Sequence, residues 1–278
     1  MTAVSGNRGV HRGGSGEPLV LIHGFSATRA HWQPILEALE RSHDVLAVNL
    51  AGHVGGPELP EGSDVSLGAL IDAVERDMDE AGFETADLVG NSLGGWIALE
   101  LARRGRARSV VAIAPAGGWE AGTRDEKRLR TLFARNHKLS TRVLPRLDKL
   151  MRRPRLRRLL LWQVASHGER IPAAVAAQMV RDSVGCSVYF DLMDAIMREG
   201  PPRSLHGITV PVALVWGTRD RILPPKRYSE RLRRMLPEAE WVELKGLGHV
   251  PMSDDPELVA RTISDFVARA SDRHAVAA

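Results

Sequence analysis

The sequence of 278 residues contains little cysteine, few aromatic side chains and little lysine, and each shortage excludes something. The single cysteine, Cys186, leaves no intramolecular disulfide framework, and we expect it to pack as a small apolar side chain. No apolar run approaches the roughly 18 residues of a membrane span, and the N-terminal segment lacks the apolar stretch of a signal peptide. We therefore predict a cytoplasmic protein with no membrane span.

Only five of the 38 basic residues are lysine, so the positive charge is almost all arginine. Fourteen Lys and Arg side chains lie between residues 120 and 160 against four acidic ones, a local net charge of +10, whereas the whole chain carries +4. The rest of the chain is therefore acidic. Because no aromatic residues are interleaved with the basic segment and no motif supports it, we predict no nucleic-acid partner.

Six short apolar runs bounded by turn residues predict buried β-strands. Most are apolar nearly throughout, which is typical of a sheet covered on both faces. Helical patterns alternate with them, and this alternation predicts an α/β fold with a doubly wound, mostly parallel sheet. The expected strands are residues 18–23, 44–50, 86–91, 109–114, 210–217 and 240–245, and the expected helices are residues 30–41, 66–81, 93–104, 226–236 and 256–270.

One long interval breaks this alternation. Residues 116–207 contain helical and charged sequence, interrupted by prolines, and no convincing strand. We predict that this interval is a helical cap, or lid, inserted into a core formed by residues 1–115 and 208–278.

The stretch Gly90-Asn91-Ser92-Leu93-Gly94 lies where an expected strand ends and an expected helix begins. A serine at such a bend adopts a strained backbone conformation, and its hydroxyl projects at the carboxyl edge of the sheet beside a helix N-terminus. Gly90 and Gly94 suit this geometry because larger side chains would collide with the neighbouring strand and helix. The context therefore favours Ser92 as a nucleophile over an ordinary turn or helix-capping serine.

A serine hydroxyl needs a base to take its proton, and that base needs an acid to orient it. His249 follows the last expected strand on a glycine-rich loop, whereas most other histidines lie in expected tails or in the cap. Asp220 follows the preceding strand in the same way and is the expected acid. Asp194, Asp254 and Asp255 are the alternatives for that role.

The transition state also needs hydrogen-bond donors for its oxyanion. The segment His23-Gly24-Phe25 lies at the end of the first expected strand, and Gly24 lets the loop turn inward. The backbone N–H groups of Phe25 and Leu93 would then converge on the oxyanion. We interpret His23 as a residue that braces this loop, not as a second base.

These segments together resemble the α/β-hydrolase superfamily, in the branch of cap-containing serine hydrolases with esterases, lipases and C–C hydrolases. The resemblance extends from about residue 17 to residue 270 and rests on HGF, GHVGGP, GNSLGGW, WGTRD and GLGHVPMSDDP. It implies an α/β-hydrolase fold with the cap between core strands six and seven. It also implies Ser92 as nucleophile, His249 as base, Asp220 as acid, an oxyanion hole of Phe25 and Leu93, and no metal or organic cofactor.

Two features depart from the family pattern. Asn49, Ala51 and Val54 replace residues that are common in a structural segment of the family. The N-terminus looks too short and too rich in glycine for the family's opening hairpin, which leaves the edge of the sheet open.

Two residues are candidates for substrate binding: Trp119 at the start of the cap and Val250 after the expected base. We expect Trp96, in contrast, to lie in the core.

The basic cap, with its run MRRPRLRRLLLW, could face an anionic substrate, an acyl carrier or an anionic membrane surface. The simpler interpretation is a solvated helix face whose leucines cover the pocket, and the sequence favours it.

We predict a serine hydrolase that cleaves a carboxylic ester, lactone or thioester through an acyl-enzyme. Its substrate would be a small acyl compound that could carry a negative charge. The alternatives are C–C bond hydrolysis of a vinylogous diketone by the same triad, and a non-catalytic ligand receptor on the same scaffold. A serine at the bend argues against the dehalogenase and epoxide-hydrolase branches of the superfamily, which use aspartate at that position. No feature of the sequence predicts an oligomeric state.

Overall fold

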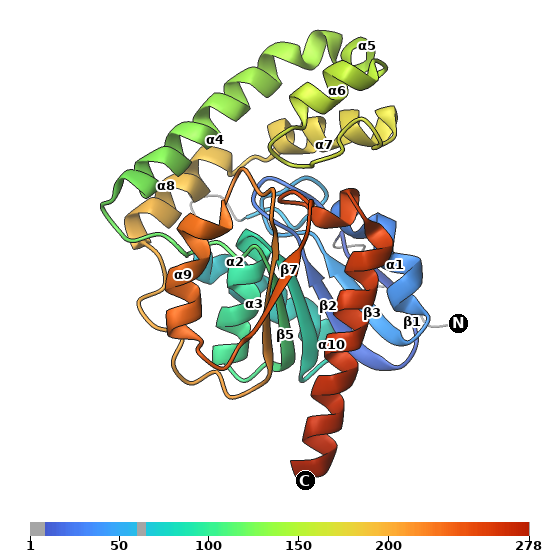
Figure 1. Ribbon diagram of the computed structural model, residues 1–278, viewed down its shortest axis with the longest axis vertical. Helices are drawn as coiled ribbons and strands as arrows, with labels where there is room; N and C mark the ends of the chain where they lie inside the picture. The colour runs from blue at the N-terminus through green and yellow to red at the C-terminus, as the bar shows by residue number, and fades with distance from the viewer. Residues whose placement is uncertain (1–8, 60–64, 278) are drawn as a thin grey trace.

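The computed structural model describes residues 9–59 and 65–277, and a seven-stranded sheet runs through its centre (Figure 1). The strand order is β1-β3-β2-β4-β5-β6-β7, and all neighbouring pairs are parallel except β1 with β3. The predicted α/β class with a mostly parallel sheet is therefore confirmed. The six predicted strands are β2 (Glu17–Ile22), β3 (His43–Val48), β4 (Ala86–Asn91), β5 (Ala107–Ile113), β6 (Val212–Gly217) and β7 (Glu240–Leu244).

The seventh strand, β1 (His11–Gly14), was not predicted and occupies the edge of the sheet that the sequence left open. It pairs antiparallel with β3. Its sequence HRGG shows neither an apolar run nor an alternating pattern, but backbone hydrogen bonds to β3 need neither. Gly14 and Gly16, with φ of 82° and 124°, let the chain turn from β1 into β2.

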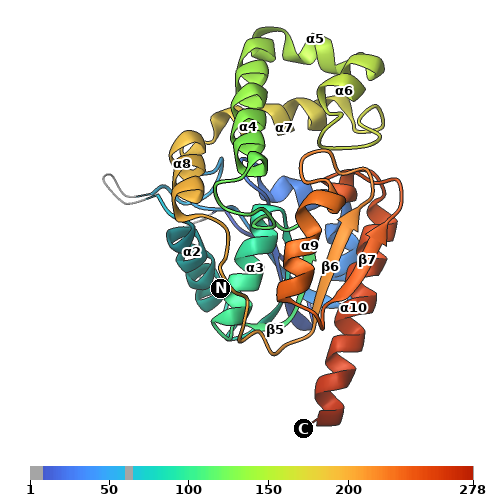
Figure 2. The same ribbon diagram turned by 60° about the vertical axis from the view of Figure 1, so that its left-hand side comes forward.

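Helices cover both faces of the sheet (Figures 1 and 2). On one face, α1 (Gln33–Glu40) and α10 (Pro256–Ala277) share a core with Leu19 and Leu21 of β2. On the other face, Val20 and Ile22 of the same strand belong to the core with α2 (Leu67–Glu80), α3 (Leu93–Arg103) and α9 (Pro225–Met235). Both faces of β2 are therefore apolar, which is why the strand shows no alternation. A 3₁₀ turn, η1 (Arg29–Trp32), precedes α1, and α10 continues beyond the predicted residue 270.

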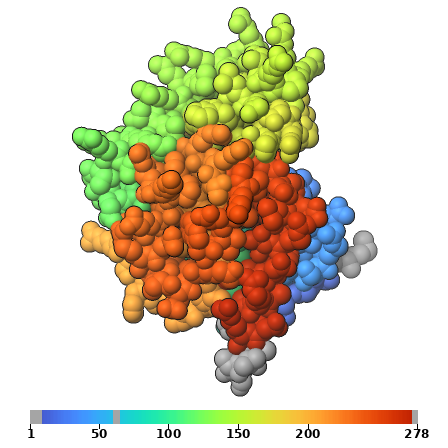
Figure 3. Space-filling view, viewed as in Figure 1, coloured from blue at the N-terminus to red at the C-terminus, as the bar shows by residue number. Residues whose placement is uncertain are grey.

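Between β5 and β6 the described chain forms helices only, and these lie over the top of the sheet in Figure 1. The space-filling view in Figure 3 shows the green and yellow part of the chain over the same end of the molecule. We call residues 116–207 the helical insert. Within it, Leu147, Met151 and Leu161 belong to a small apolar cluster separate from the two sheet cores. The elements of the insert are α4 (Arg124–Val143), η2 (Leu144–Arg146), α5 (Leu147–Met151), α6 (Pro154–Leu160), α7 (Ala173–Gly185) and α8 (Tyr189–Glu199).

The insert lies between β5 and β6, the fifth and sixth of the seven described strands, whereas the strand numbers six and seven in the prediction are those of the family. No helix in the described ranges combines the length and apolar character that crossing a bilayer requires. The cytoplasmic location stays a prediction.

Candidate active site

The segments that the sequence singles out all follow the carboxyl ends of parallel strands. Residues 23–25 follow β2, Ser92 follows β4, Asp220 is the third residue after β6, and His249 lies on the loop after β7. Parallel strands end at the same edge of the sheet, where ligands of open α/β folds bind. The fold therefore collects these residues from four distant parts of the chain.

Ser92 occupies the bend between β4 and α3 with φ 57° and ψ −116°, a conformation that is strained for any residue except glycine. Its N–H donates to the Ile113 carbonyl at 2.9 Å, which holds the bend against β5. A Cβ at Gly90 would lie 2.1 Å from the Gly94 carbonyl oxygen, and a Cβ at Gly94 would lie 2.1 Å from that of Ile22. The predicted need for glycine at both positions is confirmed.

His249 and Asp220 form a buried hydrogen-bonded pair. The ring Nδ1 lies 2.7 Å from Asp220 Oδ2. The carboxylate only accepts, so Nδ1 carries the proton and Nε2 is left as the basic nitrogen. Asp220 Oδ1 accepts the backbone N–H groups of Ile222 and Leu223 at 2.9 and 2.8 Å, which fixes the carboxylate.

The alternative acids have other partners. Asp254 accepts three backbone N–H groups, from Gly248 and residues 166–167, at 2.7 to 2.9 Å, and so joins the histidine loop to the insert. Asp255 accepts an N–H in the first turn of α10, and Asp194 is exposed on α8. Asp220 is the aspartate that the structure places on His249.

Asn91, the residue before the bend, was not singled out by the sequence. Its side-chain amide donates to the carbonyl oxygens of His249 at 3.0 Å and Ile113 at 3.2 Å. It therefore ties the serine bend to the histidine loop, and the available signal was a buried polar side chain at the end of an apolar strand. No hydrogen bond joins Ser92 Oγ to His249 in the described structure; such bonds often tighten only when substrate binds.

His23 holds the loop after β2. Its Nδ1 donates to the Gly24 carbonyl at 2.8 Å, and its Nε2 accepts the Leu50 N–H at 3.0 Å, so both ring nitrogens are used. Burial, helped by the nearby His53, holds the pKa of His23 well below its usual range and keeps the ring neutral. These contacts support the bracing role predicted for His23.

The two predicted oxyanion donors lie on either side of the bend. Leu93 is the first residue of α3, where backbone N–H groups have no partner within the helix, and Phe25 lies on the loop held by His23. Both residues line a cavity that Ser92 also lines. Their joint action on an oxyanion stays a prediction.

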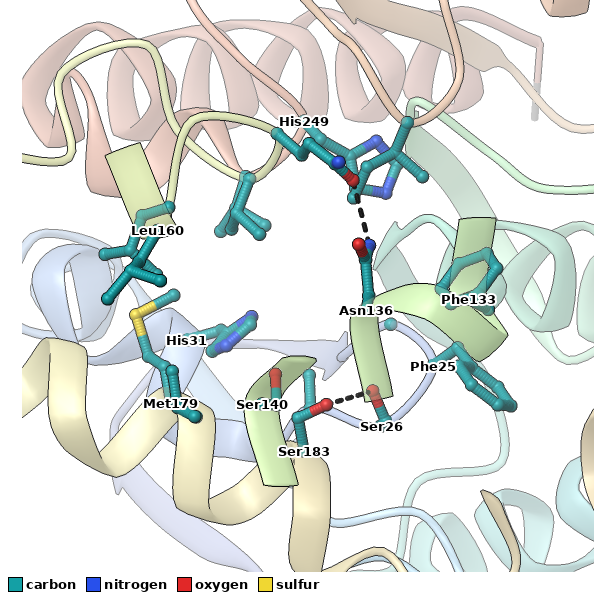
Figure 4. A pocket seen from close by; sticks show the side chains of 18 of the residues that line it. Phe25, Ser26, His31, Phe133, Asn136, Ser140, Leu160, Met179, Ser183 and His249 are labelled. Carbon is teal, nitrogen blue, oxygen red and sulfur yellow. Dashed lines mark hydrogen bonds between the residues drawn. The ribbon is translucent and has the colours of Figure 1, made fainter. Parts of the chain in front are cut away.

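The main cavity has a volume of about 170 Å³ and lies between the carboxyl edge and the insert (Figure 4). Ser92, His249 and the predicted Val250 line it, together with side chains of α4, α6 and α7. Among the described residues that line it, none is Asp, Glu, Lys or Arg. The cavity therefore suits an uncharged and largely apolar ligand.

A second cavity of about 40 Å³ reaches Ser92 from another side. The predicted Trp119 lines it, together with Trp96, whose side chain is also buried. Phe25 and Phe133 line both cavities, with ring centroids 5.2 Å apart in an edge-to-face contact. Ser92 therefore lies where a larger and a smaller cavity meet.

The basic residues of the insert do not line either cavity in the described structure. Arg128 donates to the backbone carbonyls of Arg221 and Ile222, which fastens α4 to the loop that carries Asp220. Arg157 is buried and donates to carbonyls inside the insert. These contacts favour structural and solvated roles over binding of an anionic substrate.

Cys186 is buried, as expected, and burial raises the pKa of its thiol to about 11. In the described ranges no group of three or more His, Cys, Asp or Glu side chains could hold a metal ion. The predicted absence of a cofactor stays a prediction.

The chain belongs to the alpha/beta hydrolase family, which it matches over residues 19–262. It is 34% identical over 204 residues to epoxide hydrolase EphH of Mycobacterium tuberculosis, covering 73% of this chain and 95% of that protein. It is 25% identical over 282 residues to lipase 3 of a Moraxella species, covering 96% of this chain and 82% of that protein. The solved structure of a membrane phospholipase A, a bacterial virulence factor, is similar with a TM-score of 0.73 and 26% identity, covering 94% of this chain and 82% of that chain.

Proposed function

We propose that the protein is a serine hydrolase that cleaves an uncharged carboxylic ester, lactone or thioester. One observation carries the proposal: a serine on a strained strand-to-helix bend lines the same cavity as His249, and the buried Asp220 holds the ring of that histidine. Ser92 Oγ attacks the carbonyl carbon while His249 Nε2 takes its proton, and Asp220 holds the imidazole. The amides of Phe25 and Leu93 bind the oxyanion until the alcohol or thiol leaves with the proton from His249.

Water then repeats these steps on the acyl-enzyme and releases the acid. The two cavities support an ester with one longer and one shorter portion, because they meet at Ser92. The absence of charged side chains among the described lining residues of the main cavity favours an uncharged substrate over the anionic one that the sequence left open.

C–C bond hydrolysis is the weaker alternative. It was expected to use basic residues of the cap to bind a substrate carboxylate, and no Lys or Arg lines either cavity in the described structure. A non-catalytic receptor is also disfavoured, because a strained bend and a buried ionisable pair are costly features for mere ligand binding.

Epoxide hydrolysis is a second candidate because the Mycobacterium tuberculosis relative bears that name. The epoxide-hydrolase branch uses an aspartate at the bend, whereas this chain has Ser92. Styrene oxide therefore belongs in the test as a competing substrate. Turnover of styrene oxide that survives in Ser92→Ala would favour epoxide hydrolysis by another group.

The experiment is hydrolysis of p-nitrophenyl esters from acetate to laurate by wild type, Ser92→Ala and, as control, the exposed Ser204→Ala. We expect kcat to fall by roughly 10³- to 10⁶-fold in Ser92→Ala and to stay unchanged in the control. Rapid labelling of wild type by a fluorophosphonate, absent in Ser92→Ala, identifies the nucleophile. An unaltered kcat in Ser92→Ala contradicts the proposal.

A further inference from the structure

His31 is a titratable residue in the main cavity that the proposed triad does not use (Figure 4). It lies on η1, six residues after Phe25, one of the predicted oxyanion donors. Its Nδ1 is buried and has no hydrogen-bond partner among the described residues. Burial lowers the pKa of His31 to about 4, against a smaller opposing effect of Asp182, so the ring is neutral near pH 7.

Asp182, the acidic group that acts on the pKa of His31, does not serve as its hydrogen-bond partner. Asp182 accepts the Thr28 hydroxyl at 3.0 Å and the Gln178 amide at 2.7 Å, one on each carboxylate oxygen. An unpaired buried nitrogen destabilises a fold, and such groups in native proteins call for a functional explanation. In His31 this nitrogen belongs to a side chain that also lines the main cavity.

His31 shares the main cavity with several uncharged polar side chains. Ser26 Oγ and Ser183 Oγ lie 3.0 Å apart at the same cavity. Figure 4 shows His31 with this serine pair and His249 around the open space, and Leu160 and Met179 at the cavity wall. No lining residue in the described chain is charged, so these side chains can offer hydrogen bonds but no ion pair.

We propose that His31 is a specificity-determining residue that forms a hydrogen-bonding subsite for a free hydroxyl group on the substrate. The preferred substrates are then uncharged hydroxylated esters, either esters of hydroxyacids or monoesters of diols, in place of plain alkyl esters. A neutral imidazole has one donor and one acceptor nitrogen, and a hydroxyl group can pair with either of them. This inference rests on the proposed ester hydrolysis.

The experiment compares matched esters with and without a hydroxyl group. Hydrolysis is measured by the acid that is released. The first series consists of ethyl esters of straight-chain hydroxyacids, in which the position of the hydroxyl group changes by one carbon from one ester to the next, together with the ethyl esters of the plain acids. The second series compares butyrate monoesters of diols with butyrate esters of the corresponding alkanols. The enzymes are wild type, His31→Leu, His31→Gln and, as control, the exposed His206→Leu. We expect wild type and the control to favour the hydroxylated ester at one position by at least about tenfold in kcat/KM, because the plain ester leaves a buried polar group unpaired.

In His31→Leu we expect this ratio to fall to about one, and we expect His31→Gln to retain part of the preference. The melting temperature of His31→Leu should equal or exceed that of wild type, since the unpaired nitrogen is removed. A lower melting temperature with equal loss toward both esters indicates a structural role and overturns the inference.

The remaining outcomes are also decisive. Equal ratios in wild type and His31→Leu at every hydroxyl position overturn the subsite and leave the proposed ester hydrolysis intact. If wild type hydrolyses none of the esters and Ser92 is not labelled by a fluorophosphonate, the proposed function fails, and the subsite fails with it.

Discussion

The carboxyl edge of the sheet and the helical insert contribute to the same cavity by different means. At the edge, the backbone sets each position: Ser92 has a positive φ, and two backbone N–H groups fix the Asp220 carboxylate. In the insert, side chains of helices and of the turn after α6 line the cavity, and two of them, Leu159 on α6 and Trp162 in that turn, are 65% and 47% exposed. In the proposed hydrolase, the backbone-fixed edge would then set the chemistry, and the side chains of the insert would set the substrate range.

The largest effect should follow from a change at the rigid edge. In Asp220→Asn the side chain keeps its size but loses the charge that orients and stabilises the imidazole of His249. We expect kcat for the best p-nitrophenyl ester to fall by roughly 10³- to 10⁴-fold, with the KM little changed. Steady-state kinetics at pH 7.5 measures both quantities.

Asp254→Asn is the matched control on the same side of the sheet. Asp254 accepts three backbone N–H groups and does not contact His249, so its loss should lower the free energy of unfolding by about 1–3 kcal/mol. The kcat should change far less than in Asp220→Asn. If Asp254→Asn were the more damaging variant for kcat, Asp220 would not be the catalytic acid.

A smaller and more selective effect is expected in the insert. Leu160 lines the main cavity, and Leu160→Trp adds volume to the wall without touching the triad. We expect kcat/KM for laurate to fall by about tenfold while acetate is hydrolysed as before, because only the longer ester needs the occupied space. The chain-length profile of the p-nitrophenyl series measures this change.

Leu156→Trp, on the same helix but lining neither cavity, is the control and should keep the wild-type profile. Equal loss toward acetate and laurate in Leu160→Trp would show that the insert acts on the chemistry itself. The division between rigid edge and adaptable insert would then be wrong.

The last effect concerns stability and pH, not catalysis, and compares a buried histidine of the core with an exposed one of the insert. Burial lowers the pKa of His53 from 6.5 to about 4 in the folded protein, so the unfolded chain binds more protons in this interval. The contribution of the neutral ring to the free energy of unfolding is fully present above about pH 6.5. It decreases as the pH falls toward 4, by up to about 3 kcal/mol. Urea unfolding between pH 7.5 and 4.5 measures this change in the free energy of unfolding.

His53→Gln removes the titrating group, so its free energy of unfolding should fall less steeply with decreasing pH than that of wild type. His206→Gln, at an exposed position, should follow the wild-type curve. Parallel curves for wild type and His53→Gln would mean that His53 titrates alike in the folded and unfolded chain.

The positions of Ser92, Asp220 and His249 could be predicted because each depends on local sequence. A serine between two glycines after an apolar run indicates a bend, and residues directly after parallel strands must meet at one edge. The structure places the histidine on the predicted aspartate at 2.7 Å. Their catalytic roles belong to the proposed function.

Other features had no local signal. β1 is held by backbone hydrogen bonds and has no apolar pattern. Asn91 occupies a variable position of the bend motif, and its importance follows from a contact 158 residues away in the chain. His31 resembles any polar residue before a buried tryptophan until the fold places it in the main cavity.

The sequence by itself determined the α/β class, the strands and helices that carry the site, and the candidate nucleophile, base and acid. These depend on hydrophobic pattern, glycine and chain order, which are properties of neighbouring residues. The tertiary structure decided which side chains line the two cavities, which arginines are structural, and where an unpaired nitrogen lies. The reason is that packing of distant helices against one sheet edge creates these features, and no short segment contains the information.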